Sequence, residues 1–443
     1  MQTPSSPPPP SLLSPIGYQN SSCGYCRNNA GGFSYYASTT SLTTALYQSL
    51  LNRGWRRSGS LLYKPDQRAS CCPQYTIRLD SESFHPSKDQ RQALNRFNSF
   101  ILGDPYTKEA ARLYPRSRED AKKRNTEFSV VERVHESEKD RLKTPPEPAH
   151  TLVVTLEPDN FTEEKYAVFE NYQRLVHHEP PNKITKPGFR GFLCSSPLPR
   201  STAMIDGKER RLGSYHQCYR IDGRLIAIGV LDLLPQCVSA VYFLYHESVH
   251  QHCFGKLGAL REIALAKEEG YKWWYAGFYI HNCVKMRYKG DYSPQYVLDP
   301  DSYRWDLLDD SLKKKLDSGK YGRLPHEGSE EASQSIELSD GVTESDKITD
   351  EASDSDNSPP LVDPDIPIFL RSIPGILTAD QILTEVDLDH IKLRVREQEA
   401  ETSDLISWDD SSIDNPQSIK GIIAELVAAV GPDVAKEMTV YFS

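Results

Sequence analysis

The chain has 443 residues, of which 38% are hydrophobic, and a mean hydropathy of -0.58. It is long enough for two ordinary domains and too polar for one continuous core, so we expect two folded units joined by segments without a core. No apolar run approaches membrane-spanning length, which excludes an integral membrane protein. The Ser/Pro-rich start lacks the charged and apolar regions of a secretory signal, so we expect residence in the cytoplasm, extending to the nucleus.

The formal net charge of -10 is concentrated in one segment. Residues 329–360 contain ten acidic residues and one lysine, a local charge of -9, which leaves 51 basic against 52 acidic residues elsewhere. The rest of the chain can therefore carry a positive patch despite its overall acidity. The acidic tract, placed at 325–360, cannot bury a core and is expected to be disordered, as are residues 1–15.

Residues 17–80 form a cysteine-rich module with two tight pairs, Cys23/Cys26 and Cys71/Cys72. A Cys-x-x-Cys turn presents two thiolates to the same side, and two pairs supply the four sulfurs that zinc or a small iron–sulfur cluster needs. The second pair is adjacent, so the backbone must turn sharply there. In a chain without an export signal such pairs favour metal over a disulfide. The alternative is two buried cysteines plus an accidental Cys-x-x-Cys.

A cationic stretch around Trp55 lies between the two pairs and predicts a basic surface for an anionic partner. Its members are Arg53, Arg56 and Arg57, with Lys64 close behind. Residues 85–148 are rich in charged helix formers and end in a proline cluster, so we expect a helical insertion or linker. Its basic residues have the pattern of a solvated face.

The second folded unit is placed at 150–310. We predict a strand at 152–156, a helix from Thr162 to about His177, and an antiparallel pair formed by 225–231 and 238–245. A helix at 257–269, stopped by Gly270, and a buried strand at 273–280 follow. The whole chain is then α/β (α+β), and this strand–strand–helix–strand order is similar to acetyltransferase-like (GNAT-like) acyltransferases. Residues 361–443 form a C-terminal extension with a helix near 418–430 and no assigned function.

Two features of this unit could carry chemistry. Asp232, at the end of an apolar strand, could take a proton from an attacking amine. The alternative is a turn-capping aspartate. The cationic and aromatic stretch 279–292 suits recognition of a phosphate or carboxylate, and the alternative is a surface loop with exposed lysines.

Together these stretches resemble eukaryotic arginyl-tRNA–protein transferases, in order and across 17–80, 150–195 and 211–305. The matching stretches include Gly24-Tyr25-Cys26, Arg53-Gly54-Trp55-Arg56-Arg57-Ser58-Gly59, Ser70-Cys71-Cys72-Pro73-Gln74-Tyr75, Ile228-Gly229-Val230-Leu231-Asp232, Ala259-Leu260-Arg261-Glu262-Ile263 and Gly277-Phe278-Tyr279-Ile280-His281-Asn282. Residues 246–253 depart from the family pattern.

The resemblance implies an enzyme that moves arginine from Arg-tRNA to the N-terminal α-amine of proteins beginning with Asp, Glu or oxidised Cys. That step marks them for ubiquitin-dependent degradation in the N-degron pathway. It also implies an iron–sulfur cluster or zinc on Cys23, Cys26, Cys71 and Cys72. We expect no nucleotide cofactor, no DNA and no membrane partner, and a monomer or weak oligomer.

Site roles follow from this hypothesis. Asp232 is the candidate base, and Tyr242 or Tyr279 could donate to the leaving ribose oxygen or to the oxyanion. The candidates for binding the acidic acceptor are His281, Lys285, Arg287, Lys289 and Gln236. The candidates for tRNA are Arg53, Arg56, Arg57 and Lys64, with salt-sensitive binding. Two rivals stay open: an N-acetyltransferase that uses acetyl-CoA, and a non-catalytic cysteine-cluster adaptor that only binds protein N-termini.

Overall fold

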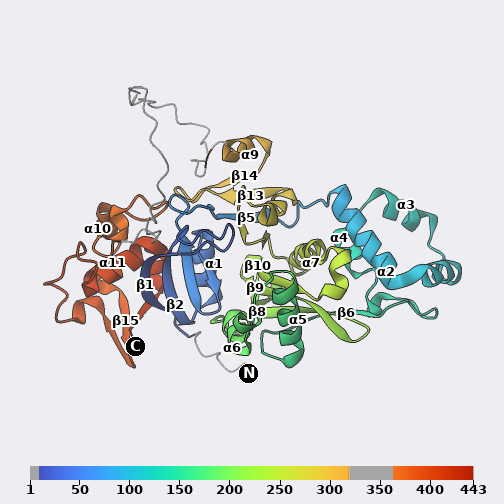
Figure 1. Cartoon of the computed structure of the whole chain (residues 1–443), viewed down its shortest axis with the longest axis horizontal. Helices are drawn as coiled ribbons and strands as arrows, with labels where there is room; N and C mark the ends of the chain where they lie inside the picture. The colour runs from blue at the N-terminus through green and yellow to red at the C-terminus, as the bar shows by residue number, and fades with distance from the viewer. Residues whose placement is uncertain (1–8, 318, 320–362, 443) are drawn as a thin grey trace, which may run out of the picture.

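A computed structural model describes residues 9–317, 319 and 363–442 (Figure 1). Residues 1–8 and the predicted acidic segment 325–360 lie outside the described residues. The described part is a mixed α/β structure built on two sheets, which confirms the α/β prediction. Among the described residues, no helix combines the length and apolar character needed to cross a bilayer.

Within the described residues, the first sheet has seven strands in the order β16-β15-β17-β1-β2-β4-β3. They are β1 (Leu12–Ser21), β2 (Gly32–Ser41), β3 (Arg56–Ser58), β4 (Leu61–Pro65), β15 (Lys392–Val395), β16 (Gln398–Glu401) and β17 (Thr439–Phe442). Strand β1 pairs antiparallel with β2 on one side and parallel with β17 on the other. The expectation that residues 1–15 are disordered is therefore wrong from Leu12 onward, because Leu12 and Leu13 pair with β17 and Leu12, Ser14 and Pro15 pair with β2.

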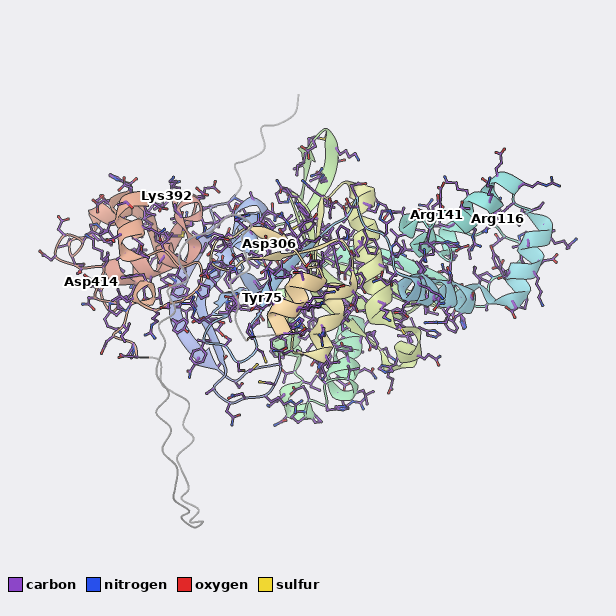
Figure 2. The ribbon with its side chains drawn as sticks, turned by 90° about the horizontal axis from the view of Figure 1, so that it is seen from above. Tyr75, Arg116, Arg141, Asp306, Lys392 and Asp414 are labelled. Carbon is purple, nitrogen blue, oxygen red and sulfur yellow. The ribbon has the colours of Figure 1, made fainter. Side chains whose placement is uncertain are left out.

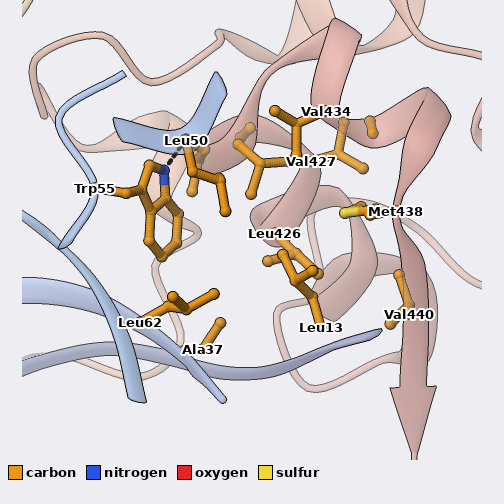
Figure 3. Packing of buried hydrophobic residues seen from close by; sticks show 14 of the residues in the cluster. Leu13, Ala37, Leu50, Trp55, Leu62, Leu426, Val427, Val434, Met438 and Val440 are labelled. Carbon is orange, nitrogen blue, oxygen red and sulfur yellow. Dashed lines mark hydrogen bonds between the residues drawn. The ribbon is translucent and has the colours of Figure 1, made fainter. Parts of the chain in front are cut away.

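The C-terminal extension completes the core of this first sheet (Figure 3). Helix α11 (Ile419–Val430), capped by Ser418, packs with α12 (Pro432–Glu437), which in turn packs with α1 (Thr44–Asn52). The indole nitrogen of Trp55 donates to the carbonyl of Ala429, 3.2 Å away and 374 residues later. Burial of these apolar residues on both segments means that the cysteine-rich region and the C-terminal extension share one core.

The second sheet, again within the described residues, has ten strands, eight of them in the order β14-β13-β5-β11-β10-β9-β8-β6. They are β5 (Tyr75–Asp80), β6 (Leu152–Pro158), β7 (Ser201–Ile205), β8 (Lys208–Ile221), β9 (Arg224–Leu234), β10 (Cys237–Tyr245), β11 (Trp273–Tyr275), β12 (Phe278–Tyr279), β13 (Gln295–Leu298) and β14 (Trp305–Leu307). The predicted antiparallel pair is confirmed as β9 and β10. Strand β5 comes from the cysteine-rich region yet lies between β13 and β11, so the two sheets are joined by a central strand.

Helices cover this second sheet. Helix α7 (Phe254–Glu269) ends at Gly270, whose φ of 78° is left-handed, as the sequence predicts. Helix α5 (Glu163–Leu175) begins at Thr162, whose side chain accepts from the N–H of Lys165. The predicted 273–280 strand is interrupted into β11 and β12, because Gly277 takes a φ of 82°.

The predicted helical region projects as an arm. It contains α2 (Lys88–Leu113), α3 (Arg118–Thr126) and α4 (Val130–His135). Figure 2 shows Arg116 and Arg141 on this arm at one end of the molecule, with Lys392 and Asp414 at the opposite end and Tyr75 and Asp306 between them.

Candidate functional site

The four paired cysteines come together at one point. Cys23 and Cys26 lie in the loop after β1, and Cys71 and Cys72 lie in the loop before β5, yet all four sulfurs lie within 4.8 Å of one another. A tetrahedral zinc ion with Zn–S bonds of about 2.3 Å would hold its sulfurs roughly 3.8 Å apart, so the set fits a metal centre. The predicted convergence is confirmed, and we call these residues the cysteine centre.

Backbone contacts hold the cysteine centre in shape. The N–H of Cys71 donates to the carbonyl of Gly31 at 2.9 Å, and the N–H of Cys23 donates to that of Asn28 at 2.8 Å. A Cβ at Gly31 would lie 2.4 Å from the Cys71 sulfur, so a larger residue there would displace that sulfur. The N–H of Asn28, with the Cys71 thiol second, lowers the pKa of Cys26 to about 7, which makes this exposed thiol a ready ligand.

The predicted basic surface around Trp55 is not a surface. Arg56, Arg57 and Lys64 are all buried. Arg57 pairs with Asp232, the predicted base, through two bonds of 2.6 and 2.7 Å. The expectation of exposed cations here is therefore contradicted, because β3 and β4 turn these side chains into the junction of the two sheets.

The other members of this set also have internal partners. Lys64 donates to the carbonyl of Arg53 at 2.8 Å and to the hydroxyl of Tyr303 at 3.0 Å. The Arg56 guanidinium lies 4.9 Å from the Phe278 ring centroid and donates to the carbonyl of Trp55. Burial lowers the pKa of both Lys64 and Arg56.

Strands β10 and β11 separate at the centre of the second sheet. They pair in parallel only between Cys237–Ser239 and Trp273–Tyr275, after which β12 pairs with β5 instead. Strand β10 continues to Tyr245, and among the described strands none pairs with it on that side beyond Ser239. We call the gap between the far half of β10 and β12 the splay. Backbone groups along this part of β10 therefore lack the ladder partner that β11 provides nearer the start of the strand.

Two charged residues packed against these strands, Lys289 and Glu262, have strongly shifted pKa values. Lys289, in η5 (Tyr288–Asp291), donates to the carbonyl of Phe278 at 3.2 Å, and burial, with the Arg56 charge second, lowers its pKa to about 8. Glu262, on the buried face of α7, accepts from the Trp274 indole at 2.9 Å, and burial raises its pKa to about 7. An acid and a base whose pKa values are both shifted toward neutral pH are typical of sites that transfer protons.

The two predicted tyrosines lie on different strands of the splay. The hydroxyl of Tyr242 lies 3.1 Å from Gln173 Nε2 and 3.1 Å from His177 Nε2. The hydroxyl of Tyr279 lies 2.6 Å from His281 Nδ1. His281 is itself buried, and its Nε2 lies 2.6 Å from a carboxylate oxygen of Asp317.

The remaining predicted acceptor-binding residues divide into two groups. Lys285 and Arg287 are exposed on α8 (Val284–Arg287), which directly precedes η5. Gln236 is exposed in the β9–β10 turn, six residues from Tyr242 and therefore roughly 20 Å away along the strand. The structure thus brings Lys285, Arg287 and Lys289 to the splay and leaves Gln236 apart.

Glu262 was given no role by the sequence reasoning, although it lies in a family-like stretch. Its signal is its position: Gly258, Leu265 and Ala266, which share its face of the helix, are all buried, so a carboxylate falls on an apolar helical stripe. A charged residue on such a stripe either pairs or shifts its pKa.

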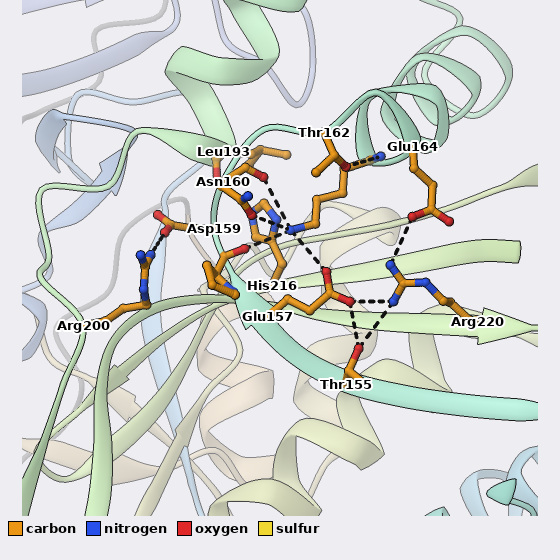
Figure 4. A network of polar contacts seen from close by, with 12 residues as sticks. Thr155, Glu157, Asp159, Asn160, Thr162, Glu164, Leu193, Arg200, His216 and Arg220 are labelled. Atoms are coloured by element: carbon orange, nitrogen blue, oxygen red, sulfur yellow. Dashed lines mark hydrogen bonds and ion pairs between the residues drawn. The ribbon is translucent and has the colours of Figure 1, made fainter. Parts of the chain in front are cut away.

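A polar network fixes α5, the helix that carries Gln173 to Tyr242 (Figure 4). The buried ammonium of Lys165 donates to the Pro158 carbonyl at 2.9 Å and lies 3.5 Å from Glu157. Arg220 donates to Glu157 at 2.6 Å and also pairs with Glu164. The network holds α5 against β6 and β8. It thereby positions Gln173, which donates to the Tyr242 hydroxyl.

Comparison with known proteins identifies relatives along both halves of the chain. A family model described as "Arginine-tRNA-protein transferase, N terminus" matches residues 21–92, and one described as "Arginine-tRNA-protein transferase, C terminus" matches residues 164–299. The arginyl-tRNA–protein transferase 1 of Drosophila melanogaster is 30% identical over 71% of this chain and 86% of its own length. That of Saccharomyces cerevisiae is 31% identical over 58% of this chain and 50% of its own.

A bacterial protein is also similar. The aspartate/glutamate leucyltransferase of Pseudomonas aeruginosa is 27% identical over 61% of this chain and 88% of its own length. Among solved structures, L-PGS from Bacillus licheniformis matches 47% of this chain and 45% of its own at 9% identity, with a TM-score of 0.26, too low to identify a fold.

Proposed function

Because the chain belongs to the arginyl-tRNA–protein transferase family, we propose that it transfers arginine from Arg-tRNA to the N-terminal α-amine of proteins that begin with Asp, Glu or oxidised Cys. Such arginylation would mark these proteins for ubiquitin-dependent degradation. One observation carries the proposal. Strand β5 belongs to the segment matched by the N-terminal family model and is a central strand of the sheet formed by the segment matched by the C-terminal model. The two segments therefore build one site.

The acceptor class has separate support. The Pseudomonas relative is named for aspartate and glutamate acceptors but for leucine as the transferred residue. Residues that the two chains have in common should then recognise the acidic acceptor. Residues that differ between them should recognise the donor. Lys289 and the exposed Lys285 and Arg287 supply cations for the acidic side chain of the acceptor.

The reaction needs alignment and one proton transfer. The acceptor nitrogen attacks the ester carbonyl carbon, the new peptide bond forms, and the bond to the ribose oxygen breaks. A proton leaves the amine and ends on the ribose oxygen. We assign its acceptance to Glu262, whose pKa of about 7 leaves it able to take and release a proton at neutral pH. This assignment replaces Asp232, which Arg57 already engages.

Tyr242 and Tyr279 keep their proposed role of donating to the leaving oxygen or the oxyanion, since they lie on the two sides of the splay. Because three of the four cations predicted to bind the tRNA are buried, and Arg53 is half-buried, the tRNA needs further exposed cations. The helical arm offers Arg118, Lys122 and Lys123, all exposed on α3. The fold of the splay and α7 is consistent with a GNAT-like acyltransferase.

The cysteine centre would hold zinc or an iron–sulfur cluster through Cys23, Cys26, Cys71 and Cys72. When bound, the group would supply a cross-link between the β1–β2 and β4–β5 loops. Elemental analysis and absorption spectra of anaerobically purified protein distinguish the two, since zinc gives no visible band and a cluster does.

The function is tested by transfer of labelled arginine from charged tRNA to two peptides that differ only in a first residue of Glu or Met. Label on the Glu peptide alone is the expected result. Label on both peptides would show that the enzyme does not require an acidic first residue in the acceptor. No label on either peptide, from protein with a loaded cysteine centre, would contradict the transferase function.

A further inference from the structure

Asp317 lies outside residues 164–299, which the C-terminal family model matches, and none of the roles assigned so far uses it. It is the last residue of α9 (Asp310–Asp317). The apolar face of this helix is buried in the core of the second sheet, where Leu312 and Leu316 are 6% and 2% exposed. The core therefore holds α9 in place and fixes where the Asp317 carboxylate lies.

The charge of Asp317 is unfavourable for α9 itself. The last carbonyl groups of a helix carry partial negative charge, so a carboxylate at this end is repelled and a cation is preferred. The last turn of α9 supplies such cations in Lys314 and Lys315. Asp317 therefore does not stabilise its own helix, and the favourable contacts of its carboxylate lie on another segment.

That segment runs from β12 into α8. One carboxylate oxygen of Asp317 lies 2.6 Å from His281 Nε2 and 3.7 Å from a guanidinium nitrogen of Arg287. The hydrogen bond with His281 holds the pKa of Asp317 below its usual range, so the carboxylate is charged at neutral pH. An ionised carboxylate can only accept, so His281 Nε2 carries the proton and donates it.

His281 is fixed from both sides. The residue is 4% exposed, and its second ring nitrogen, Nδ1, lies 2.6 Å from the Tyr279 hydroxyl. Both ring nitrogens are thus engaged within the protein, and neither is left for the carboxylate of an acceptor. This leaves Lys285 and Arg287, both exposed on α8, as the cations next to His281 that can meet an acidic acceptor.

Helix α8 has little support of its own. It has four residues, none of them buried, and no side chain caps its start. Val284, its first residue, is 88% exposed. The position of α8 is therefore set by the buried residues that flank it, which are His281 before it and Gly290 in η5 after it. A change that frees His281 should misplace the cations of α8.

We propose that Asp317 is a positioning residue for the acceptor: it fixes His281 and thereby places the cations of α8 against the acidic first residue of the acceptor. This rests on the proposed function, because it takes an acidic N-terminus as the group that α8 recognises. A bare carboxylate beside such a site would repel the acceptor. The His281 N–H and the Arg287 charge offset that repulsion, so Asp317 acts through its partners and does not touch the substrate.

The test is steady-state transfer of labelled arginine from charged tRNA to a Glu-starting peptide. Asp317→Asn keeps the size of the side chain and removes its charge, so KM for the peptide should rise about tenfold while kcat and KM for Arg-tRNA stay within about twofold. Asp310→Asn removes the same charge at the other end of α9, roughly 10 Å away, and should match the wild type. In a His281→Gln protein, the further change Asp317→Asn should alter KM by less than about twofold, because the effect passes through His281.

A second measurement needs no tRNA: fluorescence anisotropy of a Glu-starting peptide and its Gln-starting counterpart on the full chain. The wild type should prefer the Glu peptide, and Asp317→Asn should lose most of that preference. No preference in the wild type, a preference and KM unchanged in Asp317→Asn, or a fall in kcat alone would overturn the proposal while leaving the transfer reaction intact. A preference that depends on Asp317 in a protein that transfers no arginine would support the positioning role and count against the proposed function.

Discussion

Arg57 and Asp232 are 175 residues apart in sequence and form a bidentate ion pair with side-chain exposures of 2% and 0%. Arg57 belongs to the first sheet and Asp232 to the second, and the same guanidinium also donates to the Ser214 hydroxyl at 3.0 Å. The pair therefore locks the two sheets together. A guanidinium in this position is unavailable to tRNA phosphates, and the carboxylate is already engaged.

Asp232→Asn should destabilise the protein by about 3 kcal/mol, because it leaves the Arg57 charge buried without a counter-ion. Urea unfolding measures this cost. Asp206→Asn is the control: its carboxylate is 80% exposed, and Arg210, its partner, keeps the Pro235 carbonyl as an acceptor, so the change should cost about 1 kcal/mol or less. An Asp232→Asn protein of normal stability whose kcat had fallen about 100-fold would instead restore Asp232 as the base.

Glu262→Gln should lower kcat about 100-fold and abolish the rise of the rate through pH 7, because the proton acceptor is removed. In the wild type the rising limb should have a midpoint near 7, the pKa that burial sets. A stability effect follows as well. The folded pKa is raised from 4.5 to about 7, so the unfolding free energy should fall as pH rises across that interval.

Denaturant melts between pH 4 and pH 8 check the second effect, which Glu262→Gln should remove. A wild-type pH–rate profile that is flat between pH 6 and pH 8 would exclude Glu262 as the proton acceptor.

Gly31→Ala should lower the metal content of the cysteine centre, because the new methyl group would lie 2.4 Å from the Cys71 sulfur. Elemental analysis of protein purified without oxygen measures the loss. The matched control is Gly24→Ala, inside the Cys-x-x-Cys turn, where a Cβ has no neighbour within 4 Å. Equal metal content in both variants would show that the Cys71 loop adjusts and that glycine at position 31 is not required.

Lys165→Met should destabilise the protein by about 3 kcal/mol, since it removes the charge that Glu157 and the Pro158 carbonyl share in a buried position. Thermal or urea unfolding gives the value. Lys186→Met breaks an exposed pair with Glu163 near the same helix and should cost about 1 kcal/mol or less. Similar losses in the two variants would mean that the network does not hold α5.

Local order could be predicted from the sequence where one segment carries the whole signal. Thr162 caps α5 and Gly270 ends α7 at the predicted positions, because capping depends on a few adjacent residues. The convergence of two cysteine pairs was also predictable, since thiolates at such spacing can coordinate the same metal ion. The buried cations were not, because a basic stretch has the same composition whether its strand faces solvent or another sheet.

The sequence by itself determined several of the helices and strands, among them α5, α7 and the β9–β10 pair, that the four cysteines could share a metal, and which family the chain resembles. Only the tertiary structure decided that Arg57 neutralises Asp232, that Gln236 lies apart from the splay, and that Glu262 accepts from the Trp274 indole. It also decided that the C-terminal extension completes the first sheet through β17. The reason is physical: hydrogen-bond periodicity and capping act over a few residues, whereas ion pairing, desolvation and strand partnership depend on residues far apart in the chain.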